Sequence, residues 1–316
     1  SDSFLKRISI KLINKIKLWI YYHLSPSVFY RLFVRGVYDV EVAFIEGEAT
    51  RIISGSTNKK SRKLAWVHID LESNHWTKCS YRKDEEARSY GRYDKILGVS
   101  DTVCAAFQRE FPSVSVPVET MYNAVDTEDI LSKAQESVDT EHERIRLVTV
   151  GRLEAQKGYA RLLRIVNKLV EEGVDIELWI LGEGSERGVL EQYMMEHRLQ
   201  ERVFLLGFQP NPYKYLAQGD LFVCSSLAEG YSTAVTEALV LGLPVVTTAC
   251  SGMEELLQGG KYGVITANSE ESLYEGLKKV LSDVEKLSYY RCKAQERGTN
   301  LFGTSNPAER LERLLD

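Results

Sequence analysis

The sequence predicts an α/β protein built on doubly wound parallel sheets. Short apolar runs such as IRLVTV at 145–150 and DLFVCSS at 220–226 are bounded by glycine and polar turn residues, and helical segments separate them. Strands that are apolar on both faces belong to parallel sheets covered by helices on both sides. The 316 residues are 44% hydrophobic and 27% charged, which suits about two globular domains.

The first half of the chain contains four expected strands with helical segments between them. The strands cover 40–47, 63–70, 95–100 and 118–126. Residues 136–144, ESVDTEHER, have no apolar face, and we place the interdomain linker there. The predicted division is 1–38 for a basic amphipathic helical segment, 39–140 for the first domain, 141–300 for the second, and 301–316 for a C-terminal helix.

The second half shows the same alternation. Strands are expected at 145–150, 176–182, 203–207, 220–226, 244–249 and 262–267. Helices are expected at 159–172, 185–199, 212–219, 270–282 and 284–299, with a last one at 306–315. This alternation predicts a second parallel sheet.

Residues 1–38 carry an excess of positive charge. Asp2 is their one acidic residue, against Lys6, Arg7, Lys11, Lys15, Lys17, Arg31 and Arg35. Between Phe4 and Leu24 the apolar residues, Trp19 among them, fall on one arc of a helical wheel. Such a helix either lies at the surface of an anionic membrane or packs on its own sheet with a solvated basic face, and both interpretations stay open. A second short helix is expected at 27–36.

Charge and cysteine content argue against several classes of function. The net charge of −5 argues against a nucleic-acid-binding protein. The five cysteines are scattered and include no CxxC pair, so we expect neither a disulfide framework nor a structural zinc site, and a cytoplasmic location fits best. The spacing of His68, His75 and Cys79 matches no common metal site, and no metal is expected.

The stretch SLAEGYSTAVTEALVLGL at 226–243 joins two expected strands through a loop and a helix. Ser232 and Thr233 open this helix just after the first strand ends. Open parallel sheets bind ligands at the carboxyl ends of their strands, where a helix N-terminus offers free N–H groups to an anion. The stretch therefore predicts an anion site.

Two carboxylates accompany this anion site. Glu229 begins the loop Glu229-Gly230-Tyr231, and Glu237 lies more than one turn inside the helix. Alone, such a pair reads as a solvated loop acid and a surface helix acid. Beside an anion site, however, both can accept hydrogen bonds from the hydroxyl groups of a sugar and a ribose. The combination predicts a nucleotide sugar as the ligand.

A second turn in the same half of the chain supplies positive charge. In GRLEAQKG at 151–158, Gly151 ends a strand, and Arg152 and Lys157 follow it before the next helix. A forked arginine donor and a lysine point charge at the carboxyl end of a strand suit a diphosphate. LGEGSERG at 181–188 is one residue off the dinucleotide fingerprint and lacks the acidic residue that should follow, so a nicotinamide enzyme is not expected.

Several motifs, in this order, resemble the retaining family 4 glycosyltransferases of bacterial surface-polysaccharide synthesis. They are Gly151-Arg152-x4-Lys157-Gly158, LGEG at 181–184, LGF at 206–208, and Glu229-x7-Glu237 within EGYSTAVTEAL. The resemblance is dense over 145–267 and looser over 64–126. It implies the GT-B fold of two facing Rossmann-like domains, with a C-terminal helix that crosses back to the first domain. It also implies that Phe208 belongs to the donor site.

The beginning of the chain departs from this family. Members open with a strand and a glycine-rich loop of the GGxE kind, whereas the first glycine here is Gly36. We therefore expect the first domain to be incomplete, either because the natural start is absent from this chain or because the protein does without that loop.

The resemblance implies a retaining hexosyl transfer by front-face attack, in which the departing phosphate oxygen takes the proton of the acceptor. Arg152, Lys157 and the helix start at 232–233 would stabilise the leaving diphosphate. Glu229 would hold sugar hydroxyls beside the anomeric carbon. His68, at the tip of a strand, would face the donor sugar, although a histidine there can also cap the strand. No Asp-x-Asp motif is present, so we expect cationic side chains to replace a metal ion and no cofactor to be used.

The predicted function is transfer of a sugar from a nucleoside-diphosphate sugar, with UDP favoured, to a polysaccharide or lipid-linked saccharide acceptor. The expected location is the cytoplasm, and attachment to the inner face of the cell membrane depends on which interpretation of residues 1–38 holds. Two other classes stay open. One is a nucleotide-sugar-binding module without turnover, and the other is a membrane-docking scaffold that uses only residues 1–38.

Overall fold

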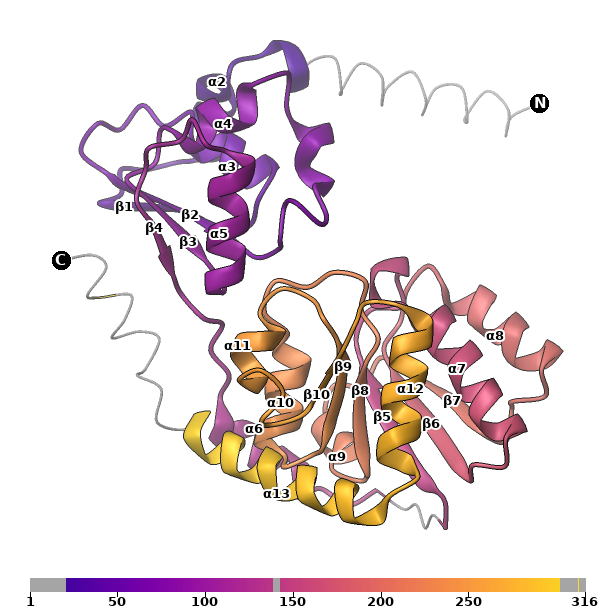
Figure 1. Cartoon of the computed structure of the whole chain (residues 1–316). Coiled ribbons are helices and arrows are strands. Elements are labelled where there is room, and N and C mark those ends of the chain that lie inside the picture. The colour runs from indigo at the N-terminus through magenta and orange to yellow at the C-terminus, as the bar shows by residue number, and fades with distance from the viewer. Residues whose placement is uncertain (1–20, 139–142, 302–311, 313–316) are drawn as a thin grey trace, which may run out of the picture. The chain divides into compact units, whose positions relative to one another are not determined.

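The computed structural model describes residues 21–138, 143–301 and 312 (Figure 1). These residues form two compact units, the first ending at Met121 and the second beginning at Tyr122. Each unit contains its own parallel sheet, as predicted. The amphipathic helix expected at 4–24 lies outside the described residues apart from its last four, and the helix expected at 306–315 lies outside them apart from residue 312.

The first unit has a four-stranded parallel sheet in the order β1-β2-β3-β4. Its strands are β1 (Val40–Ala43), β2 (Arg62–Val67), β3 (Lys95–Gly98) and β4 (Val118–Thr120). Its helices are α2 (Pro26–Phe33), α3 (Glu48–Ile53), the 3-10 helix η1 (Trp76–Ser80), α4 (Glu85–Tyr90) and α5 (Asp101–Glu110). The predicted strands and the short helix expected at 27–36 are all present.

The strands of this unit end earlier than predicted. β1 stops at Ala43 and β2 at Val67, whereas the predicted strands continue to 47 and 70. The buried carboxylate of Glu46 accepts the backbone N–H groups of His68 and Ile69, the latter at 3.1 Å. These backbone donors are therefore used by a side chain instead of extending the ladder.

The second unit has a six-stranded parallel sheet. Its strands are β5 (Ile145–Val150), β6 (Ile176–Leu181), β7 (Val203–Gly207), β8 (Leu221–Cys224), β9 (Val245–Thr248) and β10 (Val264–Thr266). Its helices are α6 (Thr127–Ala134), the 3-10 helix η2 (Ala155–Lys157), α7 (Tyr159–Glu171), α8 (Arg187–Glu196), α9 (Tyr213–Leu216), α10 (Thr233–Val240), α11 (Met253–Leu257), α12 (Glu270–Leu281) and α13 (Val284–Leu301). Across the described ranges, no helix is both long enough and apolar enough to cross a bilayer.

The strand order of the second sheet is β7-β6-β5-β8-β9-β10. The chain starts at β5, moves outward to β7, and then returns to place β8 on the other side of β5. This reversal creates a topological switch point between β5 and β8, where loops on either side diverge and ligands of doubly wound sheets bind.

Helices cover the sheet on both faces (Figure 1). On one face α7, α8 and α12 share a core with the strands, formed by side chains such as Leu163, Leu190, Leu277 and Leu178. α10 packs against β8 and β9, and α13 packs against α10. The close crossing of α13 and α10 requires Gly298, because a Cβ atom there would lie 2.3 Å from the carbonyl oxygen of Leu239.

The division between the units falls earlier than the linker expected at 136–144. Helix α6 belongs to the second unit because it packs against α9 and α10. The side-chain amide of Asn211 donates to the carbonyl oxygen of Lys133 at 2.9 Å, and Lys214 forms an ion pair with Glu136 at 3.1 Å. These contacts attach the segment after β4 to the six-stranded sheet, and the polar composition of 136–144 did not reveal them.

Candidate functional site

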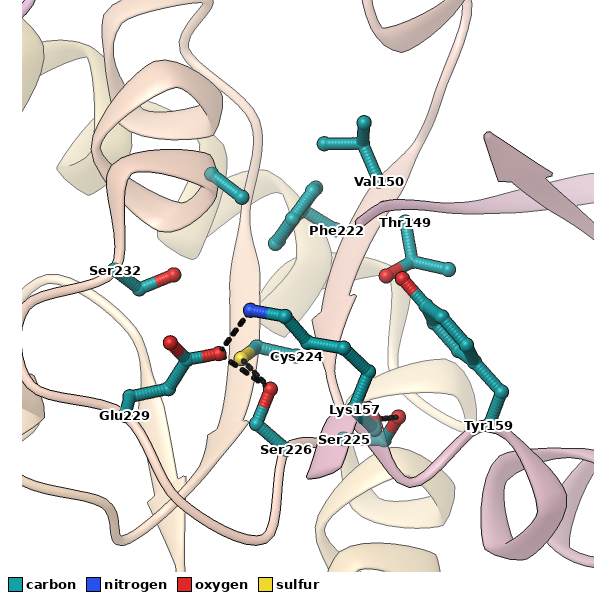
Figure 2. Close-up of a pocket in the computed structure, with 11 residues that line it drawn as sticks. Thr149, Val150, Lys157, Tyr159, Phe222, Cys224, Ser225, Ser226, Glu229 and Ser232 are labelled. Carbon is teal, nitrogen blue, oxygen red and sulfur yellow. Dashed lines mark hydrogen bonds and ion pairs between the residues drawn. The ribbon is translucent and has the colours of Figure 1, made fainter. Parts of the chain in front are cut away.

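Three of the predicted ligand residues of the second unit, Lys157, Glu229 and Ser232, gather at the switch point. The turn after β5 brings Lys157, and the loop after β8 brings Ser226 and Glu229, to the same small pocket (Figure 2). Ser232, at the start of α10, lines the pocket as well. The pocket therefore lies at the carboxyl ends of β5 and β8, where the sequence placed an anion site.

Lys157 and Glu229 form an ion pair at the centre of this pocket. The Nζ of Lys157 lies 2.7 Å from Oε1 of Glu229, and the hydroxyl of Ser226 donates to the same oxygen at 2.5 Å (Figure 2). Glu229 is only 8% exposed, and its Oε2 makes no hydrogen bond with the residues described. The carboxylate is thus fixed through one oxygen, while the other can accept a hydrogen bond from a ligand.

A buried arginine holds the loop that carries Glu229. Arg161 donates from Nε and Nη2 to the carbonyl oxygen of Ser225 at 2.8 and 2.6 Å, and from Nη2 to that of Ser226 at 2.6 Å. The side chain of Gln156 donates to the carbonyl oxygen of Ala228 at 2.8 Å. Charged donors on backbone carbonyls are strong hydrogen bonds in buried surroundings, so the loop geometry is set from α7 and η2.

Gly158 is required where the β5 turn meets this loop. Its φ of +66° favours glycine, and a Cβ atom there would lie 2.2 Å from the carbonyl oxygen of Ser225.

We expect Gly158→Ala to lower the free energy of unfolding by about 3 kcal/mol or more, since backbone strain and a backbone clash add together. The matched control is Gly173→Ala, because Gly173 has a φ of +85° but nothing within 4 Å of the added methyl group. There the cost should be only about 1–2 kcal/mol, which is the strain alone. Urea unfolding of both variants makes the comparison, and equal losses would mean that the close approach at Gly158 is unimportant.

Ser232 caps the helix that the sequence assigned to the phosphate. Its hydroxyl accepts the backbone N–H of Val235 at 3.3 Å, so it satisfies one of the free donors of α10. Thr233 is exposed at the first turn. The helix dipole and the remaining N–H groups of this turn favour an anion.

Glu237 lies one turn further along α10 in a half-buried position. The hydroxyl of Tyr213 donates to its Oε1 at 3.3 Å. Burial raises the pKa of the Glu237 carboxyl above its ordinary value. Tyr213 comes from α9, so the two helices together orient this carboxylate.

The other predicted donor residues are not among those that line the pocket, and their exposures differ. Arg152 is exposed, and its guanidinium makes no hydrogen bond with the described residues. Phe208 is 74% exposed in the turn after β7. Tyr231 is buried, and its ring lies 5.1 Å from that of Tyr122. Gly230 is buried against Gly252, where a Cβ atom would lie 2.4 Å from the Gly230 carbonyl oxygen.

The glycines of the LGEG motif at 181–184 are required by close packing, and no ligand contact is needed to explain them. A Cβ atom at Gly182 would lie 1.9 Å from the carbonyl oxygen of Gly151, and one at Gly184 would lie 2.4 Å from that of Leu153. The backbone N–H of Leu153 donates to the carbonyl oxygen of Glu183 at 2.9 Å. The turn after β6 therefore supports the turn that carries Arg152.

His68 lies in the first unit, directly after β2. Its Nε2 lies 2.7 Å from the carbonyl oxygen of Phe44, and its ring meets the Phe44 ring edge-on at 4.9 Å. Its backbone N–H is held by Glu46. These contacts attach His68 to the residue after β1, as expected if the histidine caps the strand. They do not test whether His68 also contacts a sugar.

Sequence reasoning missed the residues that position the others. Ser226 and Tyr213 donate to the two carboxylates, Arg161 holds the loop that carries Glu229, and Glu46 holds His68. Ser226 stands three residues before Glu229, but nothing in the pattern marked its hydroxyl as a donor to that carboxylate. Arg161 resembled any other charged residue on an amphipathic helix.

The sequence profile described as "Glycosyl transferases group 1" matches residues 132–297, which is more than half of the chain. The chain belongs to the glycosyl transferases group 1 family. The match covers the whole switch-point pocket and both Glu229 and Glu237. The family resemblance predicted from the motifs is therefore confirmed.

Relatives of this group 1 glycosyltransferase chain act on lipid-linked acceptors according to their names. One is N-acetylgalactosamine-N,N'-diacetylbacillosaminyl-diphospho-undecaprenol 4-alpha-N-acetylgalactosaminyltransferase from Campylobacter jejuni, 35% identical over 66% of this chain and 56% of the relative. Another is the GPI3 subunit of phosphatidylinositol N-acetylglucosaminyltransferase from Saccharomyces cerevisiae, 34% identical over 44% of this chain and 32% of the relative. The chain spans about half the length, or less, of these relatives.

Solved structures confirm the GT-B fold class of this group 1 chain. Staphylococcus aureus TarM, in a complex that contains UDP, has a TM-score of 0.75 at 16% identity, covering 92% of this chain and 59% of TarM. Anabaena HepE in complex with UDP and glucose has a TM-score of 0.70 at 18% identity, covering 88% of this chain and 77% of HepE. At such low identity the likeness concerns the fold alone.

Proposed function

We propose that this protein is a glycosyltransferase that moves a hexose from a nucleoside-diphosphate sugar, with UDP as the nucleotide, to a saccharide acceptor. The observation that carries the proposal is the Lys157–Glu229 pair at the switch point, beside the start of α10. A cation, a carboxylate with one free oxygen and a helix N-terminus match the diphosphate and the hydroxyl groups of such a donor.

The proposed donor contacts combine residues that line the pocket with others that the motifs assign to the donor. The diphosphate lies against Lys157, Arg152 and the N–H groups at Ser232 and Thr233. Glu237 accepts hydrogen bonds from the ribose hydroxyls. Gly151, Phe208, Gly230 and Tyr231 shape the walls around the nucleotide and the sugar.

Donor binding should rearrange the central ion pair. In the structure, the carboxylate of Glu229 partly neutralises the positive charge of Lys157. A diphosphate competes for that charge, because it carries more negative charge than one carboxylate. Once Lys157 turns to the phosphates, Glu229 can accept hydrogen bonds from sugar hydroxyls beside the anomeric carbon. The pair would thus keep both charges compensated until the donor arrives.

The proposed transfer retains the anomeric configuration and uses no metal. The leaving phosphate oxygen takes the acceptor's proton while the acceptor oxygen attacks the same face of the sugar. Lys157, Arg152 and the α10 amides stabilise the charge that grows on the diphosphate. We further propose His68 as a sugar-contacting residue, as the family resemblance implies. A mass-spectrometric and NMR analysis of the product's linkage tests retention, and activity in excess chelator tests metal independence.

The acceptor is proposed from the relatives, whose names describe a diphospho-undecaprenol saccharide and a phosphatidylinositol. A lipid-linked saccharide places the reaction at a membrane surface. We propose that the basic residues of 1–38 bind anionic headgroups on the cytoplasmic face. Each lysine or arginine near an anionic leaflet contributes about 1 kcal/mol, so several suffice for reversible attachment.

We expect the change of Arg7, Lys11 and Lys15 to glutamate to abolish sedimentation with vesicles of phosphatidylcholine and phosphatidylglycerol. Binding of the unaltered protein should weaken as salt rises, because screening shortens the reach of these charges. Equal binding to vesicles of phosphatidylcholine alone would show that residues 1–38 recognise no anionic surface.

A transfer assay tests the proposed function. The protein is incubated with a panel of nucleoside-diphosphate sugars and a bacterial lipid extract, and acceptor-dependent release of the nucleoside diphosphate is measured. Release from a UDP-sugar only when the extract is present supports the proposal. Donor binding without release would indicate the nucleotide-sugar-binding module, and vesicle binding without donor binding would indicate the docking scaffold.

A further inference from the structure

A shallow pocket on the first unit is lined by an arginine cluster that the proposed chemistry does not use. Its walls come from the start of α2 and from α4 with its flanking turns, and we call it the arginine pocket. It is lined by Pro26, Arg82, Glu85, Arg88, Ser89 and Arg92. Three cations and one carboxylate thus line one depression.

The single carboxylate of the arginine pocket is already engaged. Oε1 of Glu85 forms an ion pair at 2.9 Å with Arg51, which is 1% exposed, and Oε2 accepts the backbone N–H of Arg82 at 3.0 Å. Both oxygens are therefore held from the protein side, and the charge of Glu85 is offset by the buried guanidinium of Arg51.

None of the three arginines forms an ion pair with a carboxylate among the residues that the structure describes. Arg88 donates to the carbonyl oxygen of Lys83 at 3.3 Å, and Arg92 donates to that of Ser54 at 3.2 Å. Carbonyl oxygens are neutral, so these contacts orient the side chains without neutralising them. Arg82 makes no side-chain hydrogen bond with any residue that the structure describes.

Local geometry brings these guanidinium groups together. Arg88 lies in α4 (Glu85–Tyr90), and Arg92 lies in the turn after the helix, where its backbone N–H donates to the carbonyl oxygen of Ser89 at 3.1 Å. Arg82 comes from the turn before the helix. Elsewhere in the unit, Arg109 shows the contrasting case, since Glu72 holds it at 2.6 Å.

We propose that the arginine pocket binds a phosphate group. A planar guanidinium group can donate two N–H hydrogen bonds to the oxygens of one phosphate. Three guanidinium groups around one depression supply more donors and more positive charge than a single carboxylate ligand would need. The phosphate can belong to a lipid headgroup or to a soluble phosphorylated compound. The site lies wholly in the first unit, so the proposal holds whether or not the second unit transfers a sugar.

The test compares two double variants that lose the same charge. Arg88→Gln with Arg92→Gln removes two pocket cations. Lys59→Gln with Lys60→Gln removes two cations from the loop before β2, which do not line the pocket. Excess UDP keeps the proposed donor site occupied in all samples, and UDP affinity of each variant is measured separately.

Two readouts distinguish the sources of the phosphate. For a lipid source, partition onto phosphatidylcholine–phosphatidylglycerol vesicles should fall about tenfold or more in the arginine variant and stay near the unaltered value in the lysine variant. For a soluble source, vesicle binding stays the same, and the rise in Tm caused by inorganic phosphate is lost in the arginine variant alone. Equal behaviour of the two variants in both readouts would overturn the proposal, because total charge would then explain all binding.

Discussion

Lys157→Ala is expected to lower kcat/KM for sugar transfer by about 10²–10³-fold, the loss typical of removing one preorganised donor to a developing anion. Arg152→Ala should also lower it strongly. Because Arg152 is exposed and makes no hydrogen bond with described residues, its loss should leave Tm unchanged. Lys168→Ala, on the outer part of α7, is the matched control and should keep full activity.

A structural explanation of the Lys157 effect must be separated from the chemical one. Removing Lys157 leaves the buried carboxylate of Glu229 without its cation, which can destabilise the loop. In the double variant Lys157→Ala with Glu229→Gln, no unpaired charge is left, so Tm should recover while activity stays well below that of Glu229→Gln alone. Activity equal to that of Glu229→Gln alone would show that Lys157 acts only by holding the loop.

Glu229→Gln is expected to lower kcat by about 10²-fold, because the carboxylate stabilises the sugar as the glycosidic bond breaks. The affinity for UDP should rise or stay unchanged. In this variant the positive charge of Lys157 is no longer paired with the carboxylate of Glu229, so Lys157 can interact more strongly with the diphosphate. Steady-state kinetics beside UDP calorimetry measures both quantities. An unchanged kcat with weaker UDP binding would mean that Glu229 contacts the nucleotide instead.

The sequence allowed the strands and the site region to be located, because apolar runs and turn residues are local signals. The strand predicted at 203–207, VFLLG, has the same bounds as β7. Where a strand end depends on a distant side chain, the prediction ran too long, as at β2, whose next two backbone donors bind Glu46.

Pairing between distant segments could not be predicted. Lys157 and Glu229 were assigned to the diphosphate and to the sugar separately, and their 2.7 Å ion pair depends on β8 returning beside β5. The same return brings Arg161 to the carbonyl groups of the loop. Packing decided these contacts, and no spacing in the sequence encodes them.

Calorimetric titration of UDP into the protein and into a Glu237→Gln variant tests most directly the claim that the switch point is a nucleotide-sugar site. We expect saturable binding with one site per chain, weakened about tenfold or more in the variant, since a hydrogen bond to a charged group contributes about 1.5–3 kcal/mol. Tyr213→Phe, which removes the hydroxyl that orients Glu237, should weaken it less. Absence of UDP binding by the unaltered protein, or equal affinity in the Glu237 variant, would contradict the assignment.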